Sequence, residues 1–330
     1  MTTQFPDTET LRTALSMATR APSIHNSQPW RWTVGDKALH LYADTSRHLL
    51  HTDPDQRDLL ISCGATLHHA TVALAALGWQ SKIRRFPSDS DSGHLASIEL
   101  TRCDPSDNDV SLAAAIPRRR TDRRLFSYWP VPHADIAMIG ARVARMGILL
   151  RYVEMSNQIR SIVAESVLQH AHDGEYLEEL ATWSGRYASI AGVPARSAPE
   201  PDHAALVPGR HFAGPVLAQP PNATADHDHG VLLALGTTED GPLARLRAGE
   251  ATSMALLTST SFGLACCPVS EPLEIRETRE AVRSEVFGVS AHPQMMLRIG
   301  WAPMNADPLP STPRRPIDDV ASIFDGSPLH

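Results

Sequence analysis

Residues 20–32 read RAPSIHNSQPWRW and join a helix-like segment to a strand-like one. Pro22 should end the preceding helix, because proline cannot continue a helix. Trp30 and Trp32 alternate with Arg31, which is the periodicity of a strand. Between these two segments stands a dense row of side chains that donate or accept hydrogen bonds. Two interpretations are open: a stiff turn that enters a core strand, or one wall of a ligand pocket.

As a ligand site, this corner has a definite chemistry. Two prolines fix its backbone, and its amide and hydroxyl side chains both donate and accept hydrogen bonds. Such a corner suits a ligand with alternating carbonyl and N–H groups, such as a flavin ring with its ribityl chain. The residues concerned are Pro22, Ser23, His25, Asn26, Gln28 and Pro29, with Trp30, Arg31 and Trp32 shaping the wall.

A second candidate site is the segment PRRRTDRRLF, residues 117–126. Five arginines in the seven residues 118–124 are costly to place together unless an anion shares them. Arginine grips phosphate through a planar, bidentate fork, and Thr121 adds a hydroxyl donor. The alternative is a solvated basic turn that pairs with acidic residues elsewhere. Arg314 and Arg315 in the tail form a third candidate, with a plain solubilising tail as its alternative.

Composition limits the class of protein. The chain has 330 residues, 42% hydrophobic and 20% charged, which is typical of a soluble globular protein. Its net charge of −7 argues against general nucleic-acid binding, although a local basic pocket remains compatible with it. The first residues do not resemble a signal peptide, and no uninterrupted apolar run approaches a membrane span. Four cysteines without C-x-x-C spacing suit a reducing compartment, so we expect a cytoplasmic protein.

The order of helical and strand-like patterns favours an α+β fold. Helices are expected at about residues 8–18, 55–77, 132–146, 157–172, 175–183, 243–265 and 273–287. Strands are expected at about 30–34, 39–43, 82–86, 96–101, 148–153, 230–237 and 295–301, the last closing a sheet. Residues 104–109 are expected to form a polar loop. Residues 192–221 hold seven prolines, so a surface loop or a covering flap is expected there.

Common catalytic motifs are missing from the sequence. It has no G-x-G-x-x-G, no P-loop, no H-E-x-x-H and no G-x-S-x-G, so the chemistry should come from a cofactor or a less familiar site. Residues 226–229, DHDH, alternate like a strand and would point to opposite faces, which disfavours a metal site. We expect no catalytic side chain and no metal, and expect burial of Cys266 and Cys267 rather than a redox role.

Taken together, the motifs resemble the FMN-dependent nitroreductase superfamily. APSIHNSQPWRW is similar to its A-P-S-x-x-N-x-Q-P-W-x-aromatic element, and RRTDRRLF to its R-R-S-x-R-x-F phosphate element, with Thr121 in the serine position. GEATSMALLTSTSFGLACCPVSE, MMLRIGWAP and TPRRP resemble its later helix, last strand and basic tail. These matches cover most of the chain, and their combination is more specific than any one of them.

The order of the motifs is unusual for that superfamily, whose ordinary members are homodimers with the arginine element first. Here the arginine element follows the other by about 90 residues, so the chain resembles two fused subunits, residues 1–110 and 111–330. This arrangement looks most like the mycobacterial Acg subgroup. The resemblance implies one FMN, a lid in residues 176–221, a basic tail in 311–330, and a single-chain pseudo-dimer that needs no partner subunit.

The resemblance also implies an activity. NAD(P)H would deliver hydride to FMN, and a nitro compound or quinone would then take it, without a catalytic side chain. Arg119, Thr121, Arg123, Arg314 and Arg315 would hold the phosphate. The alternative is a flavin-binding or flavin-sequestering protein, because a closed lid would keep nicotinamide from the flavin. A degenerate homologue that binds no flavin is a third, less favoured interpretation.

Overall fold

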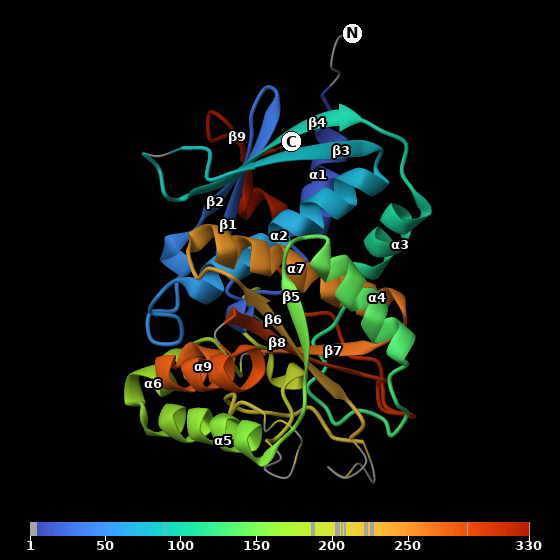
Figure 1. The fold of residues 1–330 in the computed structure, drawn as a ribbon. Coiled ribbons are helices and arrows are strands. Elements are labelled where there is room, and N and C mark those ends of the chain that lie inside the picture. Colours follow the sequence, from blue (N-terminus) through green and yellow to red (C-terminus); the bar gives the residue numbers. More distant parts are fainter. Residues whose placement is uncertain are drawn as a thin grey trace.

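The computed structural model describes residues 5–88, 90–185, 189–201, 209–220, 228–288 and 290–329, together with Ala205, Val207 and Thr224. Over these residues, helices and strands follow one another without strict alternation, and the strands form two separate sheets (Figure 1). The predicted α+β fold class is therefore confirmed.

The first sheet has the order β3 (Trp79–Arg85), β4 (His94–Arg102), β2 (Ala38–Ala43), β1 (Trp30–Val34) and β9 (Ala321–Ile323). The first four strands pair antiparallel, whereas β9 pairs parallel with β1. In β1, Trp30 and Trp32 are buried while Arg31 is exposed, as a strand with one buried face requires. Helices α1 (Thr8–Ala18), α2 (Arg57–Ala76) and α3 (Asp107–Ala115) share the core of this sheet.

The second sheet has the order β5 (Leu149–Val153), β6 (Val231–Thr237), β8 (His292–Gly300) and β7 (Ala265–Val269), and all its pairs are antiparallel. Helices α4 (His133–Ala144) and α7 (Pro242–Ser261) share one core with it. Helices α5 (Asn157–His172), α8 (Glu271–Glu274) and α9 (Arg276–Val282) share another. Strands β6 and β8 are buried on both faces; β6 is accordingly almost continuously apolar, whereas β8 also buries Gln294 and Arg298. Helix α6 (Gly174–Thr182) follows α5.

Helices α2 and α7 pack against each other between the two sheets (Figure 1). Gly64 and Gly249 lie where the two helices meet. A Cβ atom on Gly64 would overlap the carbonyl of Leu246, and one on Gly249 would overlap the carbonyl of Ile61. Glycine at both positions therefore allows the two backbones to touch.

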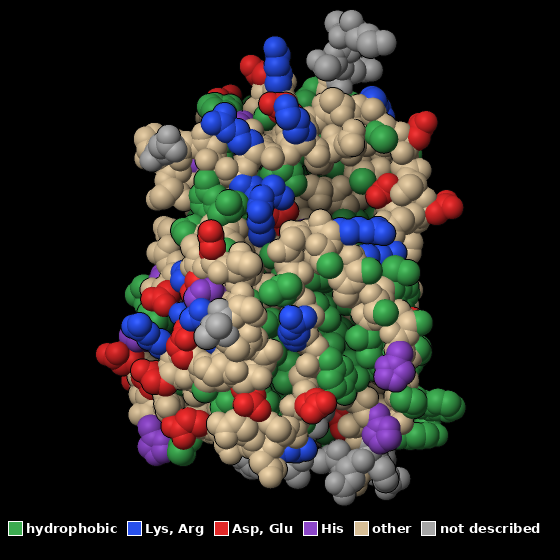
Figure 2. Space-filling view, in the orientation of Figure 1, with side chains coloured by type: hydrophobic (Ala, Val, Ile, Leu, Met, Phe, Trp, Pro, Cys, Tyr) green, Lys and Arg blue, Asp and Glu red, His purple; other side chains and the backbone are tan. Residues whose placement is uncertain are grey.

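Helix α2 is long and apolar enough to cross a membrane by length and composition alone. However, 83% of its most apolar window is buried inside the protein, so its role in the core accounts for that character. A helix was expected at about residues 55–77, but it was not considered as a membrane span because polar residues interrupt its apolar run. Acidic and basic side chains are interspersed over the face shown in Figure 2.

Several expected elements differ from the structure. The loop expected at 104–109 contains the start of α3, which Ser106 caps together with Asp109. The helix expected at 243–265 ends at Ser261. Residues 265–269 form the edge strand β7, so β8 lies inside the sheet instead of closing it. The helix expected at 273–287 is divided into α8, α9 and a π-helical turn.

Candidate functional site

A cavity of about 140 Å³ lies where α2 and α7 approach β7, β8 and the corner that precedes β1. Helix α2 lines it with Asp58, Ile61, Ser62 and Ala65, which share one face because they are three or four residues apart. The remaining wall comes from residues far apart in sequence. These are Pro22, Ser23, Ile24, His25, Thr121, Arg123, Val207, Gly209, Arg210, Phe212, Thr252, Cys267, Pro268, Val269, Ser270, Glu271, Met295 and Arg298.

The corner at residues 22–28 has an unusual backbone. His25, Asn26 and Gln28 have φ angles of 43°, 54° and 54°, in the left-handed region that side chains other than glycine rarely adopt. Such residues cost of order 1–3 kcal/mol each and persist where the surrounding structure holds them, often at ligand sites. Here the hydroxyl of Ser23 accepts a hydrogen bond from the backbone N–H of Gln28 at 3.0 Å and closes the turn.

His25 is only 5% exposed, and its contacts fix its tautomer. The guanidinium of Arg210, which can only donate, lies 2.8 Å from Nε2. Nε2 must therefore accept, and the proton of the neutral imidazole sits on Nδ1, which is buried without a partner within the described chain. Burial, followed by the charges of Arg210 and Arg123, lowers the pKa of His25 well below its usual range. The residue thus offers an unused N–H donor in the wall of the cavity.

The other corner residues act mainly on the protein itself. The amide nitrogen of Asn26 donates to the carbonyls of Gly192 (3.1 Å) and Pro313 (3.2 Å). The amide nitrogen of Gln28 donates to Ile190 (2.9 Å), and its oxygen accepts from the backbone N–H of Arg315 (2.9 Å). The carbonyl of Pro29 accepts from Asp44 at 3.0 Å. None of these side chains lines the cavity, and neither do those of Trp30, Arg31 and Trp32.

The residues of the arginine-rich segment 117–126 have different contacts in the structure. Thr121 and Arg123 line the cavity, and Arg123 donates to the carbonyl of Ser197 at 3.0 Å while lying over the ring of Phe212. Arg124 pairs with Asp122 of the same segment at 2.8 Å, both side chains buried. Arg119 is 6% exposed, and its Nε and Nη1 atoms have no hydrogen-bond partner among the described residues.

The tail brings a further guanidinium to the same region. Arg314 donates to the carbonyls of Thr19 (3.0 Å), Arg20 (3.1 Å) and Ala21 (3.1 Å), which follow α1. Arg315 lies apart from the cavity, where it forms an ion pair with Asp44 at 3.4 Å. The structure thus brings one of the two tail arginines close to Arg119.

Arg20, Arg119 and Arg314 form a group that we call the arginine cluster. Burial lowers the pKa of Arg119 and of Arg314, and repulsion from neighbouring guanidiniums lowers both further. Within the described ranges, no member of the cluster forms an ion pair with a carboxylate. Buried charges are normally paired, so this arrangement fits an anion as the missing partner.

The geometry of α2 places the cluster relative to the cavity. Burial lowers the pKa of His69 well below its usual range, and the charge of Arg119 lowers it further, so the two groups interact electrostatically. His69 lies one helical turn beyond Ala65, at the end of the cavity-lining face. At 1.5 Å per residue, it is about 16 Å from Asp58 along the helix. Arg20, Arg119 and Arg314 do not line the cavity themselves, so a ligand would have to extend beyond Ala65 to join the arginine cluster to the part of the cavity that contains Asp58.

Sequence reasoning missed several cavity residues. Asp58, Arg210, Glu271 and Arg298 lie in segments that were expected as a helix, a lid and family motifs, but those patterns do not show which side chains face a cavity. Cys267, expected only to be buried, also lines the cavity. Of the four residues DHDH, Asp226 and His227 lie outside the described residues. The DHDH residue Asp228 forms an ion pair with Arg298 at 3.2 Å.

His68 and His69, in the middle of α2, are also buried. Their Nδ1 atoms lie 2.7 and 2.8 Å from the hydroxyl of Ser253 on α7. The pair therefore joins the two central helices.

No protein-family model matches the chain. Its curated relatives include a Mycobacterium tuberculosis protein named "Putative NAD(P)H nitroreductase Rv3131", 58% identical over 97% of this chain and 93% of the relative. "Putative NAD(P)H nitroreductase acg" of the same organism is 36% identical over 96% of each chain.

Solved structures are less similar. A structure described as a "putative nitroreductase" from Anabaena variabilis has a TM-score of 0.48 at 10% identity, covering 91% of this chain and 90% of its own. A nitroreductase with bound FMN from Bacteroides fragilis has a TM-score of 0.38 at 14% identity, covering 59% and 90%. Both likenesses are too weak to carry an inference. The sequence relatives are close and match nearly full length, which confirms the resemblance seen in the motifs: the chain belongs to the nitroreductase family that includes Acg.

Proposed function

We propose that the protein binds one FMN in this cavity and acts as an oxidoreductase that passes hydride from NAD(P)H to nitro or quinone acceptors. The observation that carries the proposal is the arginine cluster, in which the buried Arg119 has two guanidinium nitrogens without a hydrogen-bond partner and no member pairs with a carboxylate in the described chain. A phosphate would supply the missing charge, and guanidinium is well suited to bind it.

The residues along the cavity fit the remainder of FMN. Ser23, Ser62 and Thr121 present hydroxyl groups that suit a ribityl chain, and Arg123 adds a cation next to them. His25 offers its unpaired Nδ1–H at the far end, where a flavin ring has carbonyl and nitrogen acceptors. The names of the two sequence relatives, which both include NAD(P)H nitroreductase, support the same assignment.

When bound, FMN would accept hydride from the nicotinamide and release it to the acceptor. The protein would contribute binding and electrostatics. Arg119 and Arg314 would neutralise the phosphate, and the left-handed backbone at His25 and Asn26 would fix the corner beside the ribityl chain. Apolar side chains, including Ile61 and Met295, would exclude water from the reacting atoms.

Residues 176–221 would act as the lid. Val207, Gly209, Arg210 and Phe212 already line the cavity, and Arg123 contacts Phe212 from beneath. The same contacts favour the second candidate function, in which a closed lid lets the protein hold flavin without turnover. Two sheets joined by α2 and α7 support the interpretation of the chain as two fused halves with a single site.

Loading with FMN tests the site. We expect Arg119→Ala to lose most bound FMN, because removing an arginine that shares a buried phosphate takes away a charge-assisted pair of hydrogen bonds. Arg118→Ala is the matched control, since Arg118 is exposed and belongs to the same segment. Flavin absorbance after gel filtration measures the result. Full retention by Arg119→Ala would place the phosphate elsewhere.

Rapid mixing of the FMN-loaded protein with NADH or NADPH under anaerobic conditions separates the two candidate functions. Bleaching of the flavin absorbance supports the oxidoreductase. A protein that retains FMN but never bleaches would instead be a flavin-sequestering protein.

A further inference from the structure

Asp58 is a buried carboxyl group that faces the cavity and has no role so far. It stands in the first turn of α2 and lines the cavity together with His25 and Glu271. Arg57 donates to its Oδ2 atom at 2.7 Å, and both side chains are at most 3% exposed. The hydrogen bond described for this carboxyl group is the one from Arg57, and it is made to the Oδ2 atom.

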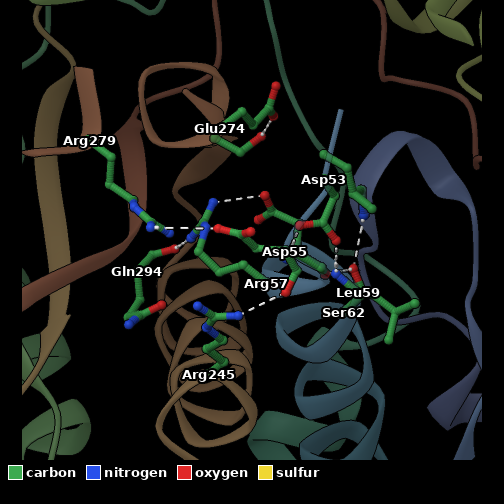
Figure 3. A network of polar contacts seen from close by, with 12 residues as sticks. Asp53, Asp55, Arg57, Leu59, Ser62, Arg245, Glu274, Arg279 and Gln294 are labelled. Atoms are coloured by element: carbon green, nitrogen blue, oxygen red, sulfur yellow. Dashed lines mark hydrogen bonds and ion pairs between the residues drawn. The ribbon is translucent and has the colours of Figure 1, made fainter. Parts of the chain in front are cut away.

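Buried carboxyl groups outnumber buried cations around Asp58. Asp53 precedes α2, and Glu271 and Glu274 belong to α8. Arg57 and Arg210 face these carboxyl groups, and His170 lies 3.3 Å from Glu271 and 3.8 Å from Glu274. Figure 3 shows Asp53, Arg57 and Glu274 around the first turn of α2. Because like charges in a buried site resist ionisation together, one of these groups should hold its proton.

The contacts show which group this is. Asp53 accepts hydrogen bonds from the backbone N–H of Asp58 (2.9 Å) and Leu59 (2.8 Å), which stabilise its ionised form. The pKa of Glu271 is lowered, since Arg210 and His170 outweigh its burial. Burial raises the pKa of Asp58; Arg57 opposes the shift, and Asp53 and Glu274 reinforce it. Burial raises the pKa of Asp53 as well, to about 6 against about 7 for Asp58, because the two backbone donors of Asp53 oppose the shift. Glu274 accepts hydrogen bonds from Arg210 and Ser270, so Asp58 is the group expected to retain the proton.

We propose that Asp58 donates the proton that accompanies hydride transfer to the acceptor, an inference that rests on the proposed function. A quinone takes up one hydride and one proton to become a hydroquinone, and NAD(P)H supplies the hydride by way of the flavin. The O–H bond of Asp58 breaks while an O–H bond forms on the quinone oxygen. Arg57 stabilises the carboxylate that remains, and water returns a proton to it.

The other titratable groups in the wall are poorer donors. His25 is a neutral imidazole whose Nδ1–H is only weakly acidic, and burial raises the pKa of the Cys267 thiol. Arg123, Arg210 and Arg298 stay charged. Among the cavity residues that the structure describes, Asp58 therefore combines a proton with the acidity needed to release it.

The two half-reactions test the proposal separately. Hydride transfer from nicotinamide to flavin takes up no proton, so Asp58→Asn should bleach at close to the wild-type rate. Reoxidation by menadione, a quinone, should slow about 100-fold or more, the usual contribution of general acid catalysis. Asp58→Glu should restore part of the rate. Glu250→Gln is the control, because Glu250 is 3% exposed and pairs with Arg85 away from the cavity.

A second readout needs no cofactor. The folded protein holds the Asp58 proton to a higher pH than the unfolded chain does, so stability falls as pH rises between the two pKa values. We therefore measure the free energy of unfolding of the FMN-free protein in urea at pH values between the two pKa values. It should fall less with rising pH in Asp58→Asn than in the wild type.

The outcomes are distinct. A wild type that binds no FMN, or never bleaches, overturns the proposed function itself. If Asp58→Asn bleaches and is reoxidised as fast as the wild type, the proton-donor assignment fails. Should the variant not fold, the wild type decides: menadione reduction that slows as pH rises through the Asp58 titration supports the assignment, and a flat profile refutes it.

Discussion

Arg210 joins the segment around residues 209–213 to the body of the protein. Its guanidinium donates to Nε2 of His25 and to the hydroxyl of Tyr176, each at 2.8 Å, and to Glu274 at 2.5 Å. The side chain of Glu274 is 1% exposed, so removing Arg210 would leave it without its closest cation. Breaking a buried ion pair from one side costs about 3–5 kcal/mol. We expect Arg210→Ala to lower the free energy of unfolding by that amount in urea denaturation.

Two variants control this measurement. Arg196→Ala removes an exposed arginine from the same part of the chain and should change stability by less than about 0.5 kcal/mol. Arg210→Met combined with Glu274→Gln removes both charges and should recover much of the loss. If Arg210→Ala were as stable as Arg196→Ala, the buried network would contribute nothing to folding.

For single residues, the sequence shows which side chains can bind a ligand but not which of them point toward the cavity. The row at 22–28 was expected to face a ligand, and Ser23 and His25 do line the cavity. The side-chain amides of Asn26 and Gln28 instead form hydrogen bonds with backbone groups of residues 190–192 and 313–315. Those partners are more than 150 residues away, so no local pattern could have indicated them.

The contact between α2 and α7 depends on two glycines. An alanine at position 64 would place its Cβ against the carbonyl of Leu246, and backbone cannot yield as a side chain can. Overpacking of a tight core costs typically 1–3 kcal/mol, so we expect Gly64→Ala to lower the free energy of unfolding by about 3 kcal/mol.

Gly140 of α4 provides the matched control for Gly64. A Cβ there would meet only a leucine methyl at 3.9 Å. Gly140→Ala should stabilise the protein by up to about 1 kcal/mol, because alanine favours a helix over glycine. Chemical denaturation measures the free energy of unfolding of both variants. If Gly64→Ala and Gly140→Ala changed it equally, the contact between α2 and α7 would not depend on glycine at position 64.

Elements with strong local signals were predictable. Ser156 caps α5, and the periodic pattern after it gave its bounds, 157–172, correctly. Strand β7, by contrast, reads ACCPV and has no alternation, although a turn at Gly263, with a φ of 85°, separates it from α7. β7 is extended because it pairs with β8, and this pairing exists only in the folded chain.

The whole molecule is tied together by its last residues. The sequence analysis assigned residues 311–330 to the second half as a basic tail. In the structure, β9 pairs with β1, and Arg314 binds the carbonyls that follow α1, so the tail docks on the first half. A parallel pairing between segments nearly 300 residues apart has no signature in either segment, which is why it was not predicted.

The same docking leads to the final prediction, that the two halves fold as one unit and need the tail. Val320 and Leu329 are each 2% exposed, and burying such a side chain stabilises a protein by about 1.5–3 kcal/mol. A chain that ends at Pro310 should therefore lose about 4 kcal/mol or more and melt earlier in a single transition. Asp318→Asn, which weakens the exposed pair with Arg12, should cost no more than about 1 kcal/mol. A truncated chain as stable as Asp318→Asn would show that the tail merely rests on the first sheet, and that the unpaired edge of β1 is tolerated without it.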